Sequence, residues 1–392
     1  MYQQRIVIVG AGIVGLSTAY ALLKQGVKHV TVLEQAVVDH QRASSHGLSR
    51  LLRFEYGPDL FYSQLVRLSL NYWRTIERAS KRTLCTPTGL LVLGNENDNF
   101  TQPSYRISRE LGLPTRRLSQ QHCQQFFPQF ATHDYDMYTY NTEAGILHAS
   151  TCLHTLKELI LDLGGNIYEV QQVTQITHDN HQRPIRLLLG SGNECIADRV
   201  VLAVGPWIHR LLDNLDLPVL LTRQYLLYFA HLSTTTFGLH TFPAFMESEL
   251  YGFPIHSTYA EHGPSWLKVA SHRFGVSVDP EQALPIDERL IAQTVRKVYD
   301  LLPAVQHAKL AHIDSYIYDV SPDEDFILDA LPDDPRVVFA TGLSGHGFKF
   351  GLVLGEMLSS LVQDTEPPAP MERFQLVRFS RSYQSQEHTS VA

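Results

Sequence analysis

The stretch RIVIVGAGIVGLSTAYALLKQGVKHVTVLE, residues 5–34, decides the fold of this chain. It opens with an apolar run at residues 6–9 that is short enough for a buried strand, and a helical pattern follows as far as about Lys24. A second apolar run at residues 30–33 predicts another buried strand. A strand, a glycine-rich turn, a helix and a second strand in one short unit predict an α/β fold that binds a dinucleotide.

The turn between the first strand and the helix has the G-x-G-x-x-G pattern. Its first glycine allows a tight turn, its second lets the backbone approach a pyrophosphate, and its third lets the helix pack on the strand. The pyrophosphate would lie on unpaired N–H groups at the helix N-terminus. An acid follows the second strand, where it can accept a hydrogen bond from a ribose hydroxyl. The predicted contacts of this unit are Gly10, Gly12, Ile13, Val14, Gly15, Glu34 and Gln35.

Composition bounds the class of protein. The chain has 392 residues, of which 44% are hydrophobic and 18% charged, so it can bury one large core or two moderate ones. Its net charge of −8 and the lack of a block dense in lysine and arginine argue against nucleic-acid binding. The 4 cysteines are scattered, which favours a reducing, cytoplasmic compartment. No H-E-x-x-H or similar spacing indicates a metal site.

Residues 6–23 carry no charge and are about as long as a transmembrane helix. Three glycines within this stretch would weaken such a helix, and no cleavage signature follows it. We therefore interpret it as a buried strand, turn and helix, and expect no transmembrane segment. The C-terminal Ser-Val-Ala is not a peroxisomal address of the Ser-Lys-Leu type. We expect a cytoplasmic monomer.

Periodicity along the rest of the chain predicts further helices and strands. The predicted helices cover residues 60–80, 148–163 and 286–302, with a last one ending near Val362. The predicted strands cover residues 89–94, 136–140, 166–176, 185–190, 195–203, 220–229, 244–253, 266–271 and 336–340.

Elements of the nucleotide-binding type occur at both ends of the chain and in its middle, with antiparallel segments between them. We therefore predict two domains between which the chain crosses repeatedly, with the site in the cleft between them. The nucleotide-binding domain comprises residues 1–84, 146–217 and 319–380. The substrate domain comprises residues 85–145 and 218–318, and residues 381–392 form a loose tail.

Five motifs occur in order along nearly the whole chain: GAGIVG at residues 10–15, SHGLSRLLR at 45–53, YGFP at 251–254, LKVASH at 267–272 and SGHGFKF at 344–350. Together they make the chain similar to the monomeric sarcosine oxidase and N-methyltryptophan oxidase family, which oxidises secondary amines of amino acids. The resemblance implies a glutathione-reductase-like Rossmann FAD domain interleaved with an antiparallel-sheet domain. It also implies that the dinucleotide is FAD and not NAD.

The resemblance places two cations around the substrate carboxylate. Arg53 matches the family's carboxylate-binding arginine, whose planar guanidinium can form two parallel bonds, and Lys349 matches the second carboxylate contact. The alternative for each is a structural salt bridge. Tyr251 and Tyr318 match tyrosines that line the substrate pocket, although buried tyrosines are also common in cores. His272 matches a histidine beside the substrate amine.

Two further cations match residues near the flavin. Arg50 matches an arginine close to the flavin ring, with a structural contact to its loop as the alternative. Lys268 matches a lysine above the flavin that is implicated in the reaction with dioxygen. A buried ammonium would stabilise developing superoxide charge. Lys268 shares a strand face with Trp266 and Ala270, which favours an inward direction over a solvent-exposed one.

The loop at residues 341–347 and the helix after it would face the N1–C2=O edge of the flavin and stabilise the anionic reduced ring. The remaining flavin contacts that the resemblance implies are Ser45, His46, Arg50, Val173, Gly205, Trp207, Gly342, Ser344, Gly345, His346, Gly347, Phe348 and Lys349.

One position departs from the family pattern. The family attaches its flavin through a cysteine shortly before a D-E-x-F-x-x-D element, which is DEDFILD at residues 323–329 here. The equivalent of that cysteine is Tyr316. We therefore expect FAD to be held non-covalently; attachment through another nucleophile such as His46 is the weaker alternative. Loss of the covalent bond also puts the strength of the oxidase activity and the identity of the substrate in question.

The resemblance implies oxidation of the secondary amine of an N-methyl or cyclic amino acid, with hydride transfer to flavin N5. The imine would hydrolyse to an aldehyde and an amine, and dioxygen would reoxidise the flavin and yield hydrogen peroxide. Two alternatives stay open. One is a dehydrogenase that passes electrons to a quinone or a protein acceptor, and the other is a flavoprotein subunit with little turnover of its own.

Overall fold

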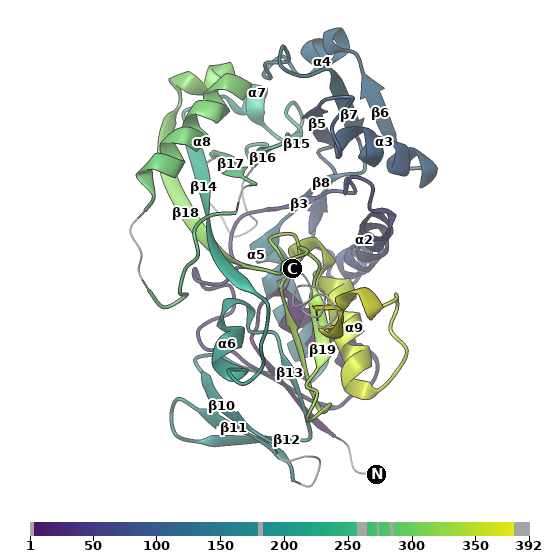
Figure 1. The fold of residues 1–392 in the computed structure, drawn as a ribbon, viewed down its shortest axis with the longest axis vertical. Helices are drawn as coiled ribbons and strands as arrows, with labels where there is room; N and C mark the ends of the chain where they lie inside the picture. Colours follow the sequence, from purple (N-terminus) through teal and green to yellow (C-terminus); the bar gives the residue numbers. More distant parts are fainter. Residues whose placement is uncertain (1–3, 179–182, 257–264, 273, 283–285, 380–392) are drawn as a thin grey trace, which may run out of the picture.

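The computed structural model of the chain describes residues 4–178, 183–256, 265–272, 274–282 and 286–379. Two large sheets dominate the fold, and segments far apart in the sequence contribute to each of them (Figure 1). None of the described helices is both long and apolar enough to cross a membrane.

The first large sheet has the strand order β19-β20-β13-β1-β2-β9. β1 runs parallel to β2 and to β13, so Val7 has Thr31 on one side and Val200 on the other. β19 runs antiparallel to β20. The strands are β1 (Arg5–Val9), β2 (His29–Leu33), β9 (Asn166–Tyr168), β13 (Arg199–Leu202), β19 (Ile327–Ala330) and β20 (Val337–Thr341).

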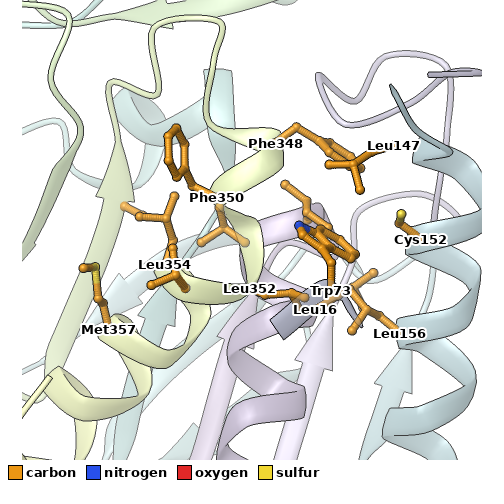
Figure 2. Packing of buried hydrophobic residues seen from close by; sticks show 14 of the residues in the cluster. Leu16, Trp73, Leu147, Cys152, Leu156, Phe348, Phe350, Leu352, Leu354 and Met357 are labelled. Atoms are coloured by element: carbon orange, nitrogen blue, oxygen red, sulfur yellow. The ribbon is translucent and has the colours of Figure 1, made fainter. Parts of the chain in front are cut away.

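Four helices form the core next to this sheet: α1 (Ile13–Lys24), α2 (Leu60–Ser80), α5 (Ala149–Asp162) and α9 (Gly351–Gln363). Figure 2 shows Leu16, Trp73, Leu156 and Leu352 from these helices meeting in one apolar cluster. α1 and α9 approach closely because Gly355 has no side chain; a Cβ there would lie 2.5 Å from the backbone of Ser17. This packing fixes the N-terminus of α1 above the sheet.

The second large sheet has the order β18-β14-β17-β16-β15-β5-β7-β6. Its neighbours are antiparallel except for β15 and β5, which are parallel. The strands are β5 (Leu90–Gly94), β6 (Thr115–Leu118), β7 (Met137–Asn141), β14 (Leu220–Ala230), β15 (Ala244–Met246), β16 (Leu250–Phe253), β17 (Leu267–Ser271) and β18 (Lys309–Val320). The helices α3 (Thr101–Glu110), α4 (Gln120–Phe126), α7 (Thr234–Phe237) and α8 (Glu288–Leu301) accompany it.

Smaller elements complete the fold. One three-stranded sheet consists of β10 (Val173–Thr177), β11 (Ile185–Leu189) and β12 (Glu194–Ala197), and another of β3 (Arg50–Leu52), β8 (Gly145–Leu147) and β4 (Cys85–Thr86). The remaining short helices are η1 (Gly205–Trp207), α6 (Ile208–Leu211), η2 (Pro303–His307), η3 (Phe348–Phe350) and η4 (Glu372–Phe374).

The predicted fold class is confirmed, and the helix predicted at residues 60–80 is α2 with the same bounds. The carboxylate of Asp59 accepts a hydrogen bond from the backbone N–H of Tyr62, which explains where α2 begins. The strands of the six-stranded sheet all come from residues assigned to the nucleotide-binding domain. The domain boundaries themselves stay a prediction.

Three predicted strands are wrong because each is two strands. Residues 166–176 divide into β9 and β10, since Val170 has a φ of 58° and turns the chain away. Residues 195–203 divide into β12 and β13 around Asp198, whose backbone N–H and carboxylate bind Arg5. Residues 244–253 divide into β15 and β16, since the carboxylate of Glu247 accepts hydrogen bonds from the backbone of the intervening turn. β18, the longest strand described, was not predicted.

Candidate functional site

A cleft of about 280 Å³, open to solvent, lies at the carboxyl ends of β1, β2 and β13. Pockets that hold small molecules usually measure about 300–1,000 Å³, so the volume of this cleft lies close to the lower end of that range. We call it the nucleotide cleft. Its lining includes Gly10, Gly12, Ile13, Val14, Glu34, Gln35, Ser45, Val173, Gly205 and Trp207, all of which the sequence predicts as cofactor contacts.

The glycine motif builds one wall of the nucleotide cleft. Gly10 has a φ of 100°, and a Cβ at this position would lie 2.4 Å from the carbonyl oxygen of Ala203. A Cβ on Gly15 would lie 1.9 Å from the oxygen of Gly10, so Gly15 packs α1 onto the turn and does not line the cleft. Gly12 is the N-cap of α1 and has no side chain, the backbone N–H of Ile13 donates to Oγ of Ser45 at 3.0 Å, and the first turn of α1 has no acidic residue. These features fit the pyrophosphate of a dinucleotide such as FAD.

Glu34 borders the same cleft and is only 5% exposed. Its carboxylate accepts hydrogen bonds from the backbone N–H groups of Ala11, at 2.8 Å, and Ala36, at 3.0 Å. Nε2 of His40 lies 3.5 Å from Oε1 of Glu34. The carboxylate is thus held beside the glycine turn, where an acid after β2 receives the ribose of a dinucleotide.

A second, smaller cavity, of about 50 Å³, adjoins the nucleotide cleft. We call it the substrate cavity. The two are linked along the chain, since Tyr318 lines the second and Asp319 the first, and Leu343 lines the first and Gly345 the second. The lining of the substrate cavity is Arg50, Leu51, Arg53, Met246, Tyr251, His272, Tyr318, Gly345, His346, Phe348 and Lys349.

Two cations that line this cavity and are predicted to bind a carboxylate both contact Tyr56, which is not itself part of the lining. The guanidinium of Arg53 lies over the Tyr56 ring, with its carbon 4.2 Å from the ring centre. Nζ of Lys349 donates hydrogen bonds to the hydroxyl of Tyr56, at 2.9 Å, and to the carbonyl oxygen of His346, at 3.0 Å. Arg53 also donates to the carbonyl oxygen of Glu55. The ion pairs formed within the described part of the chain include neither Arg53 nor Lys349.

The cationic side chains of Arg53 and Lys349 are both buried, which is uncommon for charged groups. Arg53 is 7% and Lys349 4% exposed. Burial, together with the nearby guanidinium of Arg53, lowers the pKa of Lys349 well below its ordinary value. Burial also raises the pKa of the Glu55 carboxyl, which accepts hydrogen bonds from Asn141 and from the N–H of Phe54. The site therefore concentrates positive charge that an anionic ligand would stabilise.

A polar face lies across the substrate cavity. The hydroxyl groups of Tyr251 and Tyr318 are 3.3 Å apart, and the ring of His272 lies 6.1 Å from the ring of Tyr251. The pKa of His272 is lowered by desolvation inside the cavity and then by the charges of Arg53 and Lys349. The imidazole is therefore neutral at neutral pH, although His272 as a residue is exposed and its neutrality thus depends also on the nearby charges of Arg53 and Lys349.

Arg50 is held by backbone carbonyl groups. Its guanidinium donates to the carbonyl oxygens of Ser44, His46 and Ser49. It also lies over the ring of Tyr316, with its carbon 4.9 Å from the ring centre. Tyr316, which stands where a cysteine was expected, is 5% exposed, and burial raises the pKa of its hydroxyl.

Lys268 points inward, as the strand alternation predicts, and is 1% exposed. Nζ donates to the carbonyl oxygen of Ser49 at 2.8 Å and lies 4.9 Å from the centre of the Phe253 ring. Burial, followed by repulsion from Arg50, lowers the pKa of Lys268 well below its ordinary value. Lys268 is not among the residues that line either cavity, but it shares the carbonyl oxygen of Ser49 with Arg50, which lines the substrate cavity.

Several predicted contacts with the flavin lie outside both linings. Nδ1 of His46 is 2.9 Å from Oδ1 of Asp39, and this hydrogen bond raises the pKa of His46. Ser344 is buried and donates to the carbonyl oxygen of Gly342. Gly347 packs against Leu343, where a Cβ would lie 2.8 Å away. The roles of these residues stay predictions.

Two residues of the site were not predicted. Tyr56 contacts both cations, and its place three residues after Arg53 in the same apolar run was the available signal. Asp319 lines the nucleotide cleft directly after Tyr318 and is 5% exposed. Burial raises the pKa of its carboxyl to about 6. The sequence around Asp319 does not reveal this position, because only the tertiary fold brings the carboxylate to the cleft.

Comparison with known proteins agrees with this geometry. Residues 5–361 match the family model described as FAD dependent oxidoreductase. The peroxisomal sarcosine oxidase of Mus musculus is 32% identical over 390 residues, which cover 95% of this chain and 96% of the mouse protein. The N-methyl-L-tryptophan oxidase of Yersinia pestis (strain Pestoides F) is 30% identical over 384 residues, covering 95% and 99% of the two chains.

Among solved structures, the L-proline dehydrogenase of P. horikoshii superposes with a TM-score of 0.83 at 18% identity and covers 97% of this chain and 98% of its own. This likeness concerns the fold. The family model and the two relatives cover the glycine turn, the nucleotide cleft and the substrate cavity alike. The chain therefore belongs to the FAD-dependent oxidoreductase family, with FAD as its cofactor and an amine or amino acid as the class of compound it oxidises.

Proposed function

We propose that this enzyme oxidises the secondary amine of an N-methyl or cyclic amino acid, with dioxygen as the electron acceptor. The observation that carries this proposal is the pair of buried cations, Arg53 and Lys349, at one wall of the substrate cavity. The mouse and Yersinia relatives are named for sarcosine and N-methyl-L-tryptophan, which are both secondary amines bearing a carboxylate.

The substrate carboxylate would lie between Arg53 and Lys349. A guanidinium presents a planar fork of donors, and an ammonium adds a point charge, so together they favour a carboxylate over a neutral group. Tyr56 supports this arrangement because it contacts both cations from behind. The carboxylate of the ligand would supply the negative charge that balances Arg53 and Lys349.

The amine would then face His272, Tyr251 and Tyr318. A neutral imidazole accepts a proton without adding a repelling charge, and this favours the neutral amine whose nitrogen lone pair assists oxidation. The tyrosine hydroxyls can orient the nitrogen, and the carbon next to it would be held toward the adjoining nucleotide cleft. Bound FAD supplies the acceptor for the hydride from that carbon.

Lys268 is proposed to assist the reaction with dioxygen. Its buried ammonium is fixed by the carbonyl oxygen of Ser49, which it shares with Arg50. A positive charge in surroundings of low polarity stabilises a developing negative charge more strongly than it would in water. The reduction of dioxygen yields hydrogen peroxide.

The test is an assay of hydrogen peroxide with sarcosine, other N-methyl amino acids, pipecolate and proline. Peroxide formation with at least one of them supports the proposal, and no peroxide with any of them contradicts it. Dye reduction measured in parallel, without dioxygen, separates substrate oxidation from reoxidation.

A second candidate keeps the substrate class and replaces dioxygen by a quinone or a protein acceptor. The observation that favours it is Tyr316, which removes the thiol that would attach a flavin covalently and with it a means of raising the flavin potential. The fold likeness to an L-proline dehydrogenase is compatible with it. Dye reduction much faster than oxygen consumption would favour this candidate. A subunit with little turnover would show neither reaction.

FAD is proposed to be bound without a covalent bond. Tyr316 is the residue at the expected attachment position, and its buried hydroxyl has a raised pKa, which disfavours the phenolate. Acid precipitation of the purified enzyme should leave the yellow colour in the supernatant. A yellow pellet would contradict non-covalent binding.

A further inference from the structure

Three side chains meet around one carboxylate at the rim of the nucleotide cleft. Oε1 of Glu281 accepts a hydrogen bond from the indole N–H of Trp207 at 2.7 Å. The same oxygen lies 2.7 Å from a guanidinium nitrogen of Arg42 and 3.2 Å from one of Arg210. The guanidinium carbon of Arg42 also lies 5.3 Å from the centre of the Trp207 ring. A single carboxylate thus joins three separate segments of the chain.

This cluster stands at a defined end of the cleft. Trp207 and Arg210 line the cleft together with His40, whose ring lies 6.2 Å from that of Trp207. His40 in turn lies beside Glu34, the acid expected to receive the ribose. The cluster is therefore at the adenosine end, away from the substrate cavity, which adjoins the cleft at Asp319 and Leu343.

Glu281 comes from a different part of the fold than the lining of the cleft. It lies in the connection between β17 and α8, which belongs to the part of the chain that carries the second large sheet. The backbone N–H of Glu281 donates to the Asp279 carboxylate at 2.9 Å, and Arg42 donates to the carbonyl oxygen of Pro280 at 3.3 Å. The turn that presents Glu281 is therefore held by a hydrogen bond within it and by one from Arg42.

The strength of the cluster depends on the charge of Glu281 and on the number of its partners. Hydrogen bonding from Trp207, followed by the hydrogen bond and charge of Arg42, lowers the pKa of Glu281, so it is ionised at neutral pH. The Glu281 side chain is 35% exposed, and single ion pairs of this kind are weak. Here one carboxylate accepts from two guanidinium groups and the indole of the buried Trp207, and all of these contacts must break together if the rim is to open.

We propose that Glu281 is a latch that closes the rim of the nucleotide cleft at its adenosine end and slows the release of FAD. The latch ties Trp207 and Arg210, which line the cleft, to the connection between β17 and α8. It retains the cofactor in a protein that has a tyrosine at the position of the expected covalent bond. This inference rests on FAD binding alone and is independent of the substrate.

The test measures FAD release from the holoenzyme and not its activity. After dilution, the recovery of FAD fluorescence gives the dissociation rate constant for the wild type, Glu281→Gln and a control, Glu143→Gln. Glu143 is matched because Oε1 lies 2.7 Å from a guanidinium nitrogen of Arg74, with 27% exposure, and lines neither cavity. We expect release to be about threefold to tenfold faster in Glu281→Gln and unchanged in Glu143→Gln.

A double-mutant cycle separates the latch from a general loosening of the fold. Arg42→Met and Arg42→Met/Glu281→Gln complete the cycle. The fold-increase in the FAD dissociation rate constant of the double variant should be smaller than the product of the fold-increases of the two single variants. High salt should accelerate release from the wild type more than from Glu281→Gln, because salt screens exposed pairs. Equal release rates for Glu281→Gln and wild type would overturn the proposal. Slower release in Glu281→Gln would also overturn it, since Arg42 and Arg210 would then bind the phosphates better without Glu281.

Discussion

Nζ of Lys349 donates a hydrogen bond to the hydroxyl oxygen of Tyr56 at 2.9 Å. This contact fixes a buried ammonium beside the guanidinium of Arg53, which lies over the same tyrosine ring. Two like charges are thereby held at one wall of a cavity, although burial and mutual repulsion both oppose this arrangement. In the proposed complex, a carboxylate bound between them would recover the free energy that this arrangement costs.

The first prediction concerns Tyr56. Tyr56→Phe keeps the ring under Arg53 and removes the acceptor for Lys349, so the ammonium loses its orientation. Loss of one hydrogen bond to a charged group corresponds to about 1.5–3 kcal/mol. We expect KM for an N-methyl amino acid to rise roughly tenfold or more, with a smaller effect on kcat. Steady-state kinetics check this, and an unchanged KM would mean that Tyr56 does not contribute to substrate binding.

The second prediction concerns pH. Desolvation, Arg53 and Lys349 lower the pKa of His272, so the neutral imidazole persists to a pH below the ordinary value of histidine. Lys349→Met removes one of the two repelling charges and should raise this pKa. The acidic limb of the kcat/KM profile should then move to higher pH. The control is Arg106→Met, which changes an exposed side chain. If the acidic limb stays in place or moves to lower pH, the group that titrates in the profile is not His272.

The third prediction concerns Lys268. Lys268→Met should slow reoxidation by dioxygen by about 10²-fold or more, while anaerobic reduction by the substrate changes little. Stopped-flow absorbance measures the two half-reactions separately. Because burial lowers the pKa of Lys268, its charge is lost as pH rises, below the ordinary range of lysine. Wild-type reoxidation should therefore slow at alkaline pH, and the variant should lack this decline. Equal damage to both half-reactions would refute the role.

The fourth prediction concerns the stability of the FAD-free protein. Burial raises the pKa of Asp319 to about 6 in the folded state, above its value of 3.8 in the unfolded chain. The contribution of Asp319 to stability is therefore fully present below the unfolded value and is lost as pH rises through about 6. The free energy of unfolding should fall by up to about 3 kcal/mol over this interval.

Asp319→Asn should lack that part of the pH dependence. Urea unfolding of the wild type and the variant between pH 4 and pH 7 gives the difference, which cancels the groups common to both. A difference between the two proteins that stays constant across this range would mean that Asp319 does not titrate there.

The sequence predicted the parts of the fold that local patterns determine. The unit at residues 5–34 appears as β1, α1 and β2, since the glycine spacing and the two periodicities agree with each other. The prediction from sequence failed where a single residue interrupts a strand. Val170, at a positive φ, separates β9 from β10, and Asp198, which binds Arg5, separates β12 from β13. A continuous apolar run does not reveal such a break.

The site was predictable to a similar degree. Arg53, Lys349 and His272 come from distant segments, and the structure brings them to one cavity, as the motifs imply. Tyr56 and Glu281 were missed because their importance comes from partners far away in sequence, namely Lys349 and Trp207. Such pairs are properties of the tertiary fold, and no local spacing encodes them.

The central claim is that Arg53 and Lys349 recognise the carboxylate of the amine. The most direct measurement is anaerobic bleaching of FAD by an N-methyl amino acid and by its methyl ester, in the wild type and in Arg53→Met/Lys349→Met. We expect the wild type to need a concentration of the ester at least about 10²-fold higher than that of the acid, since two charged contacts are lost. The double variant should respond to acid and ester at similar concentrations. Equal bleaching of the wild type by both compounds would contradict the account.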